Sequence, residues 1–221
     1  MNMKRFLGFV PLLAVVAFMV IPAAAQAAPH QYKNGSITAE GVKVPQIAWG
    51  TLQLENANVG LIECKNIFAG NGQNPVGGGA AEGELEAYSA FNCKSASCEA
   101  AGKAVEVFPL GLDNPKLGNW EIHTVEPTAG NFALKVGNKL AANAKQIKFK
   151  IVCAEIINVE FHGELSPATK NGTSIGASPS KVEFKAAESG ELESSLGNGT
   201  VKGKLKQMGY EGQDLLTVQN P

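Results

Sequence analysis

The stretch VGLIECKNIFAGNGQNPVGGGAAEGELEAYSAFNC (residues 59–93) decides the fold. Both of its ends alternate apolar and polar residues, which is the period of a β-strand with one buried face. Between them, five glycines and a proline in residues 71–83 supply turn and loop conformations only. The sequence therefore predicts two strands joined by a long loop, with Cys64 and Cys93 on their inward faces.

The rest of the chain repeats this pattern of short alternating runs divided by glycines. Trp49, which lies among Ile47, Leu52 and Leu54, is expected in the core. Short strands with regular turn signals are typical of sandwiches and barrels. We therefore predict an all-β fold, an antiparallel β-sandwich or barrel-like domain with long Gly/Asn-rich loops and two disulfides. The further strands are expected at residues 46–54, 104–109, 119–125, 132–136, 145–154, 156–165, 182–184, 201–205 and 215–218.

The first 27 residues have the layout of a secretory signal peptide. Lys4 and Arg5 precede an apolar run, and a small-residue tail follows with Ala25-Gln26-Ala27. We expect cleavage after Ala27, with Ala28 as the second choice. Residues 28–221 would then form a single secreted β domain, with a possible subdomain boundary near residues 166–180. No stable membrane insertion is expected after cleavage.

Charge excludes some classes of partner. Loss of Lys4 and Arg5 with the signal peptide leaves 17 of the 19 basic residues against 20 acidic ones, a net charge of −3. DNA and anionic lipid both require a concentrated basic surface. We therefore expect no nucleic acid partner.

All four cysteines lie in the exported part, and an even count outside the cytosol indicates two disulfides. Three pairings are possible. The short spacing of Cys93 and Cys98 favours a stapled turn, which leaves Cys64 with Cys153. A zinc site is the weaker alternative, because Cys64 and Cys153 lack a second ligand at C-x-x-C spacing.

Signals for catalysis are weak. Nucleophilic catalysis needs a base beside the nucleophile, and only His123 and His162 lie away from the ends of the mature chain, without a G-x-S-x-G motif. The triple glycine at residues 77–79 has no following Lys-Ser or Lys-Thr to hold a phosphate. We predict no catalytic residue, no metal site and no cofactor.

A ligand-binding face is predicted on the strand expected at residues 84–93. Alternation puts Glu84, Glu86 and Tyr88 on one face, and Trp120 and His123 follow in a neighbouring strand pattern. Aromatic rings with nearby hydrogen-bonding groups can hold a sugar. These five residues are the candidate ligand-binding set.

The same region offers an enzymatic alternative. Glycoside hydrolysis needs two carboxylates across a cleft, and Glu82, Glu84, Glu86 and Glu121 supply candidates. Consecutive glutamates on one strand face are more often solvated, which favours the non-catalytic interpretation.

Several short motifs are similar to those of exported β-rich proteins of actinobacteria. The resemblance implies export and a β fold, and no activity transfers with it. The motifs are Trp49-Gly50-Thr51-Leu52, Cys64-Lys65-Asn66, Phe68-Ala69-Gly70, Asn74-Pro75, Gly77-Gly78, Gly190-Glu191-Leu192, Gly203-Lys204-Leu205 and Gly209-Tyr210-Glu211-Gly212.

The sequence thus favours a secreted, non-catalytic protein of the cell envelope or the extracellular space, with a binding or structural role. Its candidate partners are cell-wall polysaccharide and another surface protein. The alternative is a secreted glycoside hydrolase-like enzyme.

Overall fold

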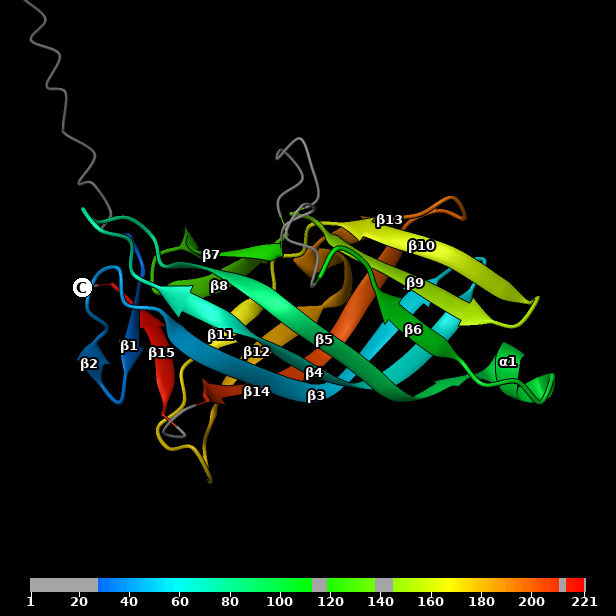
Figure 1. Cartoon of the computed structure of the whole chain (residues 1–221), viewed down its shortest axis with the longest axis horizontal. Helices are drawn as coiled ribbons and strands as arrows, with labels where there is room; N and C mark the ends of the chain where they lie inside the picture. Colours follow the sequence, from blue (N-terminus) through cyan, green and yellow to red (C-terminus); the bar gives the residue numbers. More distant parts are fainter. Residues whose placement is uncertain (1–27, 113–118, 138–144, 211–213, 221) are drawn as a thin grey trace, which may run out of the picture.

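The computed structural model describes residues 28–112, 119–137, 145–210 and 214–220 (Figure 1). The predicted signal peptide lies outside this part of the chain. One short helix, α1 (Ala96–Ala100), and one 3-10 helix, η1 (Ala186–Ser189), interrupt the strands. The strands are β1 (His30–Lys33), β2 (Ser36–Ile37), β3 (Val44–Asn56), β4 (Gly60–Gln73), β5 (Glu82–Ser95), β6 (Glu106–Pro109), β7 (Trp120–Thr128), β8 (Asn131–Val136), β9 (Ile147–Cys153), β10 (Ile157–Gly163), β11 (Ala168–Lys170), β12 (Ser180–Lys185), β13 (Glu191–Glu193), β14 (Gly199–Gly209) and β15 (Leu216–Gln219).

Eight strands form a closed antiparallel barrel in the order β12-β11-β8-β7-β5-β4-β3-β14. The ring closes where β12 pairs with β14, from Ser180 opposite Gln207 to Lys185 opposite Lys202. Closure gives every strand of the ring two neighbours, which removes the exposed edges of an open sheet. The prediction of an all-β fold is confirmed, and the architecture is a barrel with additional strands.

Four further strands form a wing, which we define as β13, β10, β9 and β6. The wing begins at β14, whose first residues Gly199 and Thr200 pair with β13, while its residues from Lys202 onward pair with β12. The wing curves back until β6 lies near β5 (Figure 1). Within the described part of the chain, no backbone ladder joins β5 to β6.

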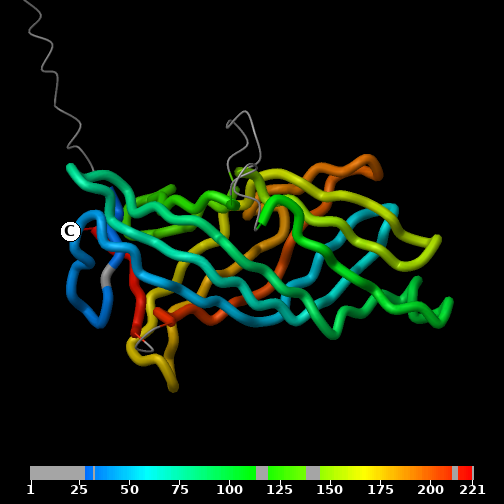
Figure 2. Tube along the Cα trace, viewed as in Figure 1, coloured from blue at the N-terminus to red at the C-terminus, as the bar shows by residue number. Residues whose placement is uncertain are grey.

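A small sheet of β15, β1 and β2 lies at the end of the barrel opposite the wing, so the first and last strands are side by side (Figure 2). A turn at Asn34 and Gly35, with φ of 51° and 81°, joins β1 to β2. The Lys33 Nζ lies 2.8 Å from a carboxylate oxygen of Asp214. Asn74 is fully buried and bonds the backbone N–H and carbonyl of Gln31 at 2.7 and 3.0 Å.

One hydrophobic core runs through both the barrel and the wing. Alternation explains its membership, because Val182 and Phe184 of β12 point inward while Glu183 between them and the lysines on either side point outward. β14 follows the same pattern with Val201 and Leu205. The fully buried side chains include those of Trp120, Phe161, Ile151, Leu192 and Val159.

The central pair of strands differs from the prediction in two respects. β4 extends to Gln73 and β5 begins at Glu82, so the loop expected over residues 71–83 spans only residues 74–81. The β4–β5 ladder also shifts register twice, and the extra residues of these bulges lie at Glu86 and near Asn92, which has φ of 50°. Each bulge reverses the facing of the residues that follow it.

The preferred disulfide pairing was wrong. The structure joins Cys64 to Cys93 and Cys98 to Cys153, with Cα–Cα distances of 4.1 and 6.1 Å. Cys64 and Cys93 lie on adjacent strands at the second bulge, whereas α1 carries Cys98 to the end of β9. Short sequence spacing favoured a turn between Cys93 and Cys98, but strand adjacency decides the pairing.

Two glycines allow β3 and β14 to approach closely where the sheet bends. A Cβ at Gly203 would stand 2.3 Å from the carbonyl oxygen of Thr51, and one at Gly50 would stand 2.2 Å from that of Lys204. Gly203 also has φ of 143°, which other residues rarely adopt. A side chain cannot fit at either position without displacing the opposite strand.

Gly203→Ala should lower the free energy of unfolding by about 3 kcal/mol, through overpacking and backbone strain. Gly176→Ala is the matched control, because a Cβ there meets nothing within 4 Å and its change should stay within about 0.5 kcal/mol. Urea unfolding followed by circular dichroism measures both. Equal stabilities of the two variants would contradict the bend at Gly203.

Replacing both Cys98 and Cys153 by alanine should lower the free energy of unfolding by about 4 kcal/mol, because the bridge spans 55 residues. The pair Cys64 and Cys93, which spans 29 residues, should cost slightly less, about 3.6 kcal/mol. Non-reducing peptide mapping checks the connectivity. A peptide containing Cys93 linked to Cys98 would refute it.

Candidate functional site

The structure divides the predicted ligand-binding residues between the two sides of the barrel wall. In β7, Trp120, Ile122 and Thr124 face the interior, so Glu121 and His123 face outward. Glu84 of β5 lies opposite Glu121, and Glu82 lies opposite His123. Glu82, Glu84, Glu121 and His123 therefore share neighbouring positions on the outer surface.

The outer carboxylates are engaged with neighbouring side chains. Glu121 lies 3.0 Å from His123 Nε2 and 3.6 Å from Lys145 Nζ. The Asn119 amide donates to Glu84 at 3.2 Å. Glu84 and Glu121 do not line the barrel cavity described below, whereas Glu82 is among its lining residues. Glu84 and Glu121 thus belong to a hydrogen-bonded outer surface in the described part of the chain.

Glu86 and Glu82 are held in the same way. The Asn71 amide donates to Glu86 at 2.6 Å, and the Gln73 amide donates to Glu82 at 3.1 Å. Because Glu86 is the extra residue of the first bulge, the alternation predicted from Glu84 through Glu86 to Tyr88 does not hold.

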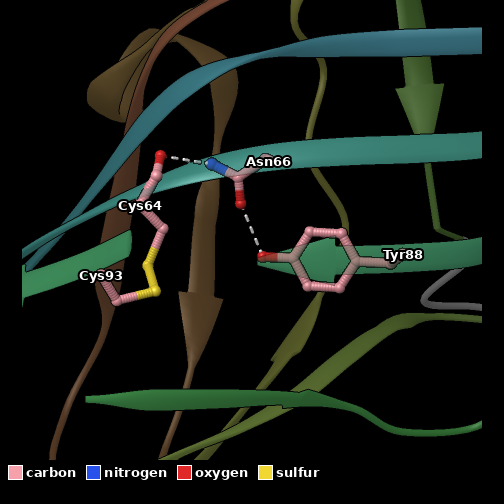
Figure 3. The surroundings of a disulfide bond; sticks show 4 residues. All are labelled: Cys64, Asn66, Tyr88 and Cys93. Carbon is pink, nitrogen blue, oxygen red and sulfur yellow. Dashed lines mark hydrogen bonds between the residues drawn. A yellow bond between two sulfur atoms is a disulfide. The ribbon is translucent and has the colours of Figure 1, made fainter. Parts of the chain in front are cut away.

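Tyr88 consequently turns into the barrel, and its predicted place beside Glu84 was wrong. Its hydroxyl donates to Asn66 Oδ1 at 2.8 Å, and the Asn66 amide donates to the Cys64 carbonyl at 2.6 Å (Figure 3). Burial raises the pKa of the Tyr88 hydroxyl. The tyrosine is therefore fixed next to the Cys64–Cys93 bridge as a neutral hydrogen-bond donor.

Tyr88 is the centre of an aromatic stack inside the barrel. Its ring centroid lies 4.6 Å from that of Phe68 and 5.6 Å from that of Trp120. The Trp120 indole donates to the Leu110 carbonyl at 3.1 Å. The two aromatic residues named from the sequence thus meet each other, separated by the barrel wall from the glutamates with which they were grouped.

The stack borders an interior cavity of about 160 Å³. The cavity extends along the barrel, from Gln31 and Val218 near the small sheet to Val107 and Ile151 in the wing. Most of its lining is apolar, including Leu52, Phe68, Leu85, Leu134, Phe184 and Leu205. The space is therefore long, narrow and mainly hydrophobic.

Polar groups gather where the cavity approaches the small sheet, and the lining also includes the charged residues Glu82, Lys170 and Lys181. The Gln207 amide donates to Gln46 Oε1 at 2.7 Å. Gln31 Oε1 and Thr169 Oγ1 are buried and have no hydrogen-bond partner in the described part of the chain. Sequence reasoning missed these residues, although Gln46 and Gln207 occupy inward positions of otherwise apolar strand faces. That irregularity is the signal that marks them.

Trp49 also lies elsewhere than predicted. Ala48, Leu52 and Leu54 of β3 face the interior, so Trp49 faces outward and is half-buried. Its neighbours across the ladder are Lys206 and Ile67. The sequence was ambiguous here, because β3 carries apolar residues on both faces.

The described residues contain no cluster of three or more His, Cys, Asp or Glu side chains suited to a metal ion. Among the elements described, no helix has the length and apolar character needed to cross a bilayer. The two disulfides fit an oxidising compartment.

Comparison with protein-family models, with curated proteins and with solved structures found no match.

The raised pKa of Tyr88 predicts a loss of stability at alkaline pH. An unfolded tyrosine ionises above about pH 10. The folded protein resists ionisation there, so stability that is present below pH 10 is lost as the pH rises further. Tyr88→Phe should remove most of this dependence between pH 10 and 11.

Urea midpoints measured from pH 8 to 11 check the prediction. At pH 8 the variant should be less stable by about 1–2 kcal/mol, because Asn66 loses its hydrogen-bond donor. Tyr210→Phe is the control, since Tyr210 is exposed. The same alkaline slope in Tyr88→Phe and wild type would count against the assignment.

Proposed function

We propose that this protein is an exported, non-catalytic binding protein that holds a small linear apolar molecule inside its barrel. The observation that carries the proposal is the elongated, mainly apolar cavity of about 160 Å³ with polar groups near one end.

The volume supports binding of a compact apolar ligand. A cavity of about 150 Å³ lined by Leu, Ile and Phe binds benzene, and eight-stranded barrels are of a size that can enclose one small ligand. The length of the cavity between Gln31 and Val107 favours a linear molecule over a globular one of the same volume.

The two unpartnered polar atoms favour a hydroxyl head group on the ligand. An unpartnered buried polar atom costs about 1–3 kcal/mol, and Gln31 Oε1 and Thr169 Oγ1 are two such atoms. A ligand hydroxyl can donate to one of them and accept from the threonine. An unbranched alcohol therefore matches both the apolar wall and its polar end.

Export is supported by two features, the signal-peptide layout of residues 1–27 and the two disulfides. The hydrolase alternative has less support, because Glu84, Glu86 and Glu121 bond neighbouring side chains and do not line the cavity. Of its four candidate carboxylates only Glu82 is among the lining residues, and hydrolysis needs two.

Octan-1-ol should raise the melting temperature of the mature protein by about 5–10 °C at a hundred times its Kd. Octane should bind more weakly, because it satisfies neither Gln31 nor Thr169. Calorimetric titration and thermal unfolding measure both effects.

A bulky substitution inside the cavity tests whether the cavity is the binding site. Ala48→Phe places a ring in the cavity and should abolish the thermal shift, whereas Ala87→Phe adds the same atoms at an exposed position of β5 and should leave it intact. Should Ala48→Phe fail to fold, Gln31→Leu replaces it and should erase the preference for octanol over octane. No shift in the wild type, or equal shifts in all variants, would refute the proposal.

A further inference from the structure

Seven lysines lie on one outer surface of the barrel, which we call the lysine face. They belong to β4, β11, β12 and β14, which lie with β3 around one side of the ring (Figure 1). The inward facing of Val182, Phe184, Val201 and Leu205 makes the alternate residues point outward. All seven side chains are exposed: Lys65, Lys170, Lys181, Lys185, Lys202, Lys204 and Lys206.

The strand register aligns some of these lysines into a row across the sheet. Lys170 lies opposite Lys181, Lys181 opposite Lys206, and Lys206 opposite Trp49. Ile67, which is 38% exposed, continues the row on β4. Since neighbouring strands are about 4.8 Å apart, three positive charges and an indole follow one another at intervals of about 5 Å.

The face keeps a surplus of positive charge. Glu183 lies 2.9 Å from Lys204 and 3.5 Å from Lys170, and these lysines hold the pKa of its carboxyl below the usual range. Glu188 lies 3.9 Å from Lys185. The remaining four, Lys65, Lys181, Lys202 and Lys206, form no ion pair with any carboxylate that the structure describes.

This arrangement is unfavourable for the protein alone. Like charges directly opposite each other in a ladder are destabilising, and Lys170 with Lys181, Lys181 with Lys206, and Lys185 with Lys202 are three such pairs. An anionic ligand lying across the strands would replace this repulsion by attraction. The register thus indicates a linear ligand with repeated negative charges.

We propose that the lysine face binds an anionic polysaccharide, which crosses the strands along the row from Lys170 to Trp49. One sugar ring contacts the Trp49 indole, and carboxylate or phosphate groups on the following sugars pair with Lys206 and Lys181. This inference goes beyond the proposed function, because the face lies outside the barrel and the cavity lies within it. The overall charge of −3 had suggested no such surface, since a sum over the chain hides the segregation of the lysines.

The composition of the face favours a glycan over a membrane or a nucleic acid. Trp49 is half-buried among longer lysine side chains, so its ring is accessible to a flat sugar but does not project as membrane insertion requires. Signal-directed export would place the protein away from nucleic acid. An indole next to a cation suits a sugar that carries an acidic group.

The test uses polygalacturonate, a linear glycan with one carboxylate per sugar, and the mature protein. Lys181→Gln, Lys202→Gln and Lys206→Gln are combined in one variant. The matched control combines Lys43→Gln, Lys103→Gln and Lys150→Gln, which removes the same charge outside the face. We expect the first variant to lose at least about tenfold in affinity, the control to stay within about twofold, and wild-type binding to weaken as salt rises.

Trp49→Leu separates sugar contact from charge. It should weaken binding of polygalacturonate about fivefold and leave binding of inorganic polyphosphate, which has no rings, unchanged. An octanol-induced rise in melting temperature for the triple lysine variant would show that its cavity and fold remain intact. If octanol does not raise the melting temperature of the wild type, far-ultraviolet circular dichroism serves as the folding control.

Three outcomes would overturn the proposal. They are equal affinity of the two triple variants for polygalacturonate, equal effects of Trp49→Leu on both polymers, and binding confined to DNA or to vesicles of equimolar phosphatidylglycerol and phosphatidylcholine. Failure of octanol to bind while polygalacturonate binds would refute the cavity proposal and leave this one standing.

Discussion

The exchange of partners along β14 is the constraint on which the molecule depends. One edge of this strand pairs with β3 throughout, while its other edge pairs first with β13 and then with β12. Gly203 lies just after the change, where a Cβ would strike the Thr51 carbonyl. Because the chain can bend there, the same strand closes the barrel and starts the wing. The interior cavity and the outer lysine face both follow from that closure.

The two disulfides lie at places where the backbone hydrogen bonds between strands are interrupted or absent. Pairing of β12 with β14 closes the barrel through the backbone, but among the described residues no ladder links β5 with β6. The Cys98–Cys153 bridge connects the helix that follows β5 to the wing at this side. The Cys64–Cys93 bridge fixes the bulged part of β4 and β5 beside Tyr88 (Figure 3). Each disulfide thus lies where the regular ladder is interrupted or absent.

Alternation of residues was enough to predict the fold class and most strands, because a barrel strand must separate an apolar face from a polar one. It could not predict which strands are adjacent, and so the cysteine pairing was wrong. It also could not detect the bulge at Glu86, which reverses the facing of Tyr88. Tyr88 and Trp120 were both named as candidate ligand-binding residues, but their meeting inside the barrel depends on long-range pairing. The lysine face likewise arises from register between strands far apart in sequence.

The small sheet joins the two ends of the chain, since β1 pairs with β15 almost 190 residues later, from His30 opposite Gln219 to Lys33 opposite Leu216. In a chain that emerges from its amino terminus, β1 must wait for the last strand before its ladder can form. Closing so long a loop carries a large entropic cost, and distant pairings are slow to form. The ladder between β1 and β15, beside Gln31, is therefore expected to form after the hairpins β3–β4 and β7–β8, whose strands are close in sequence.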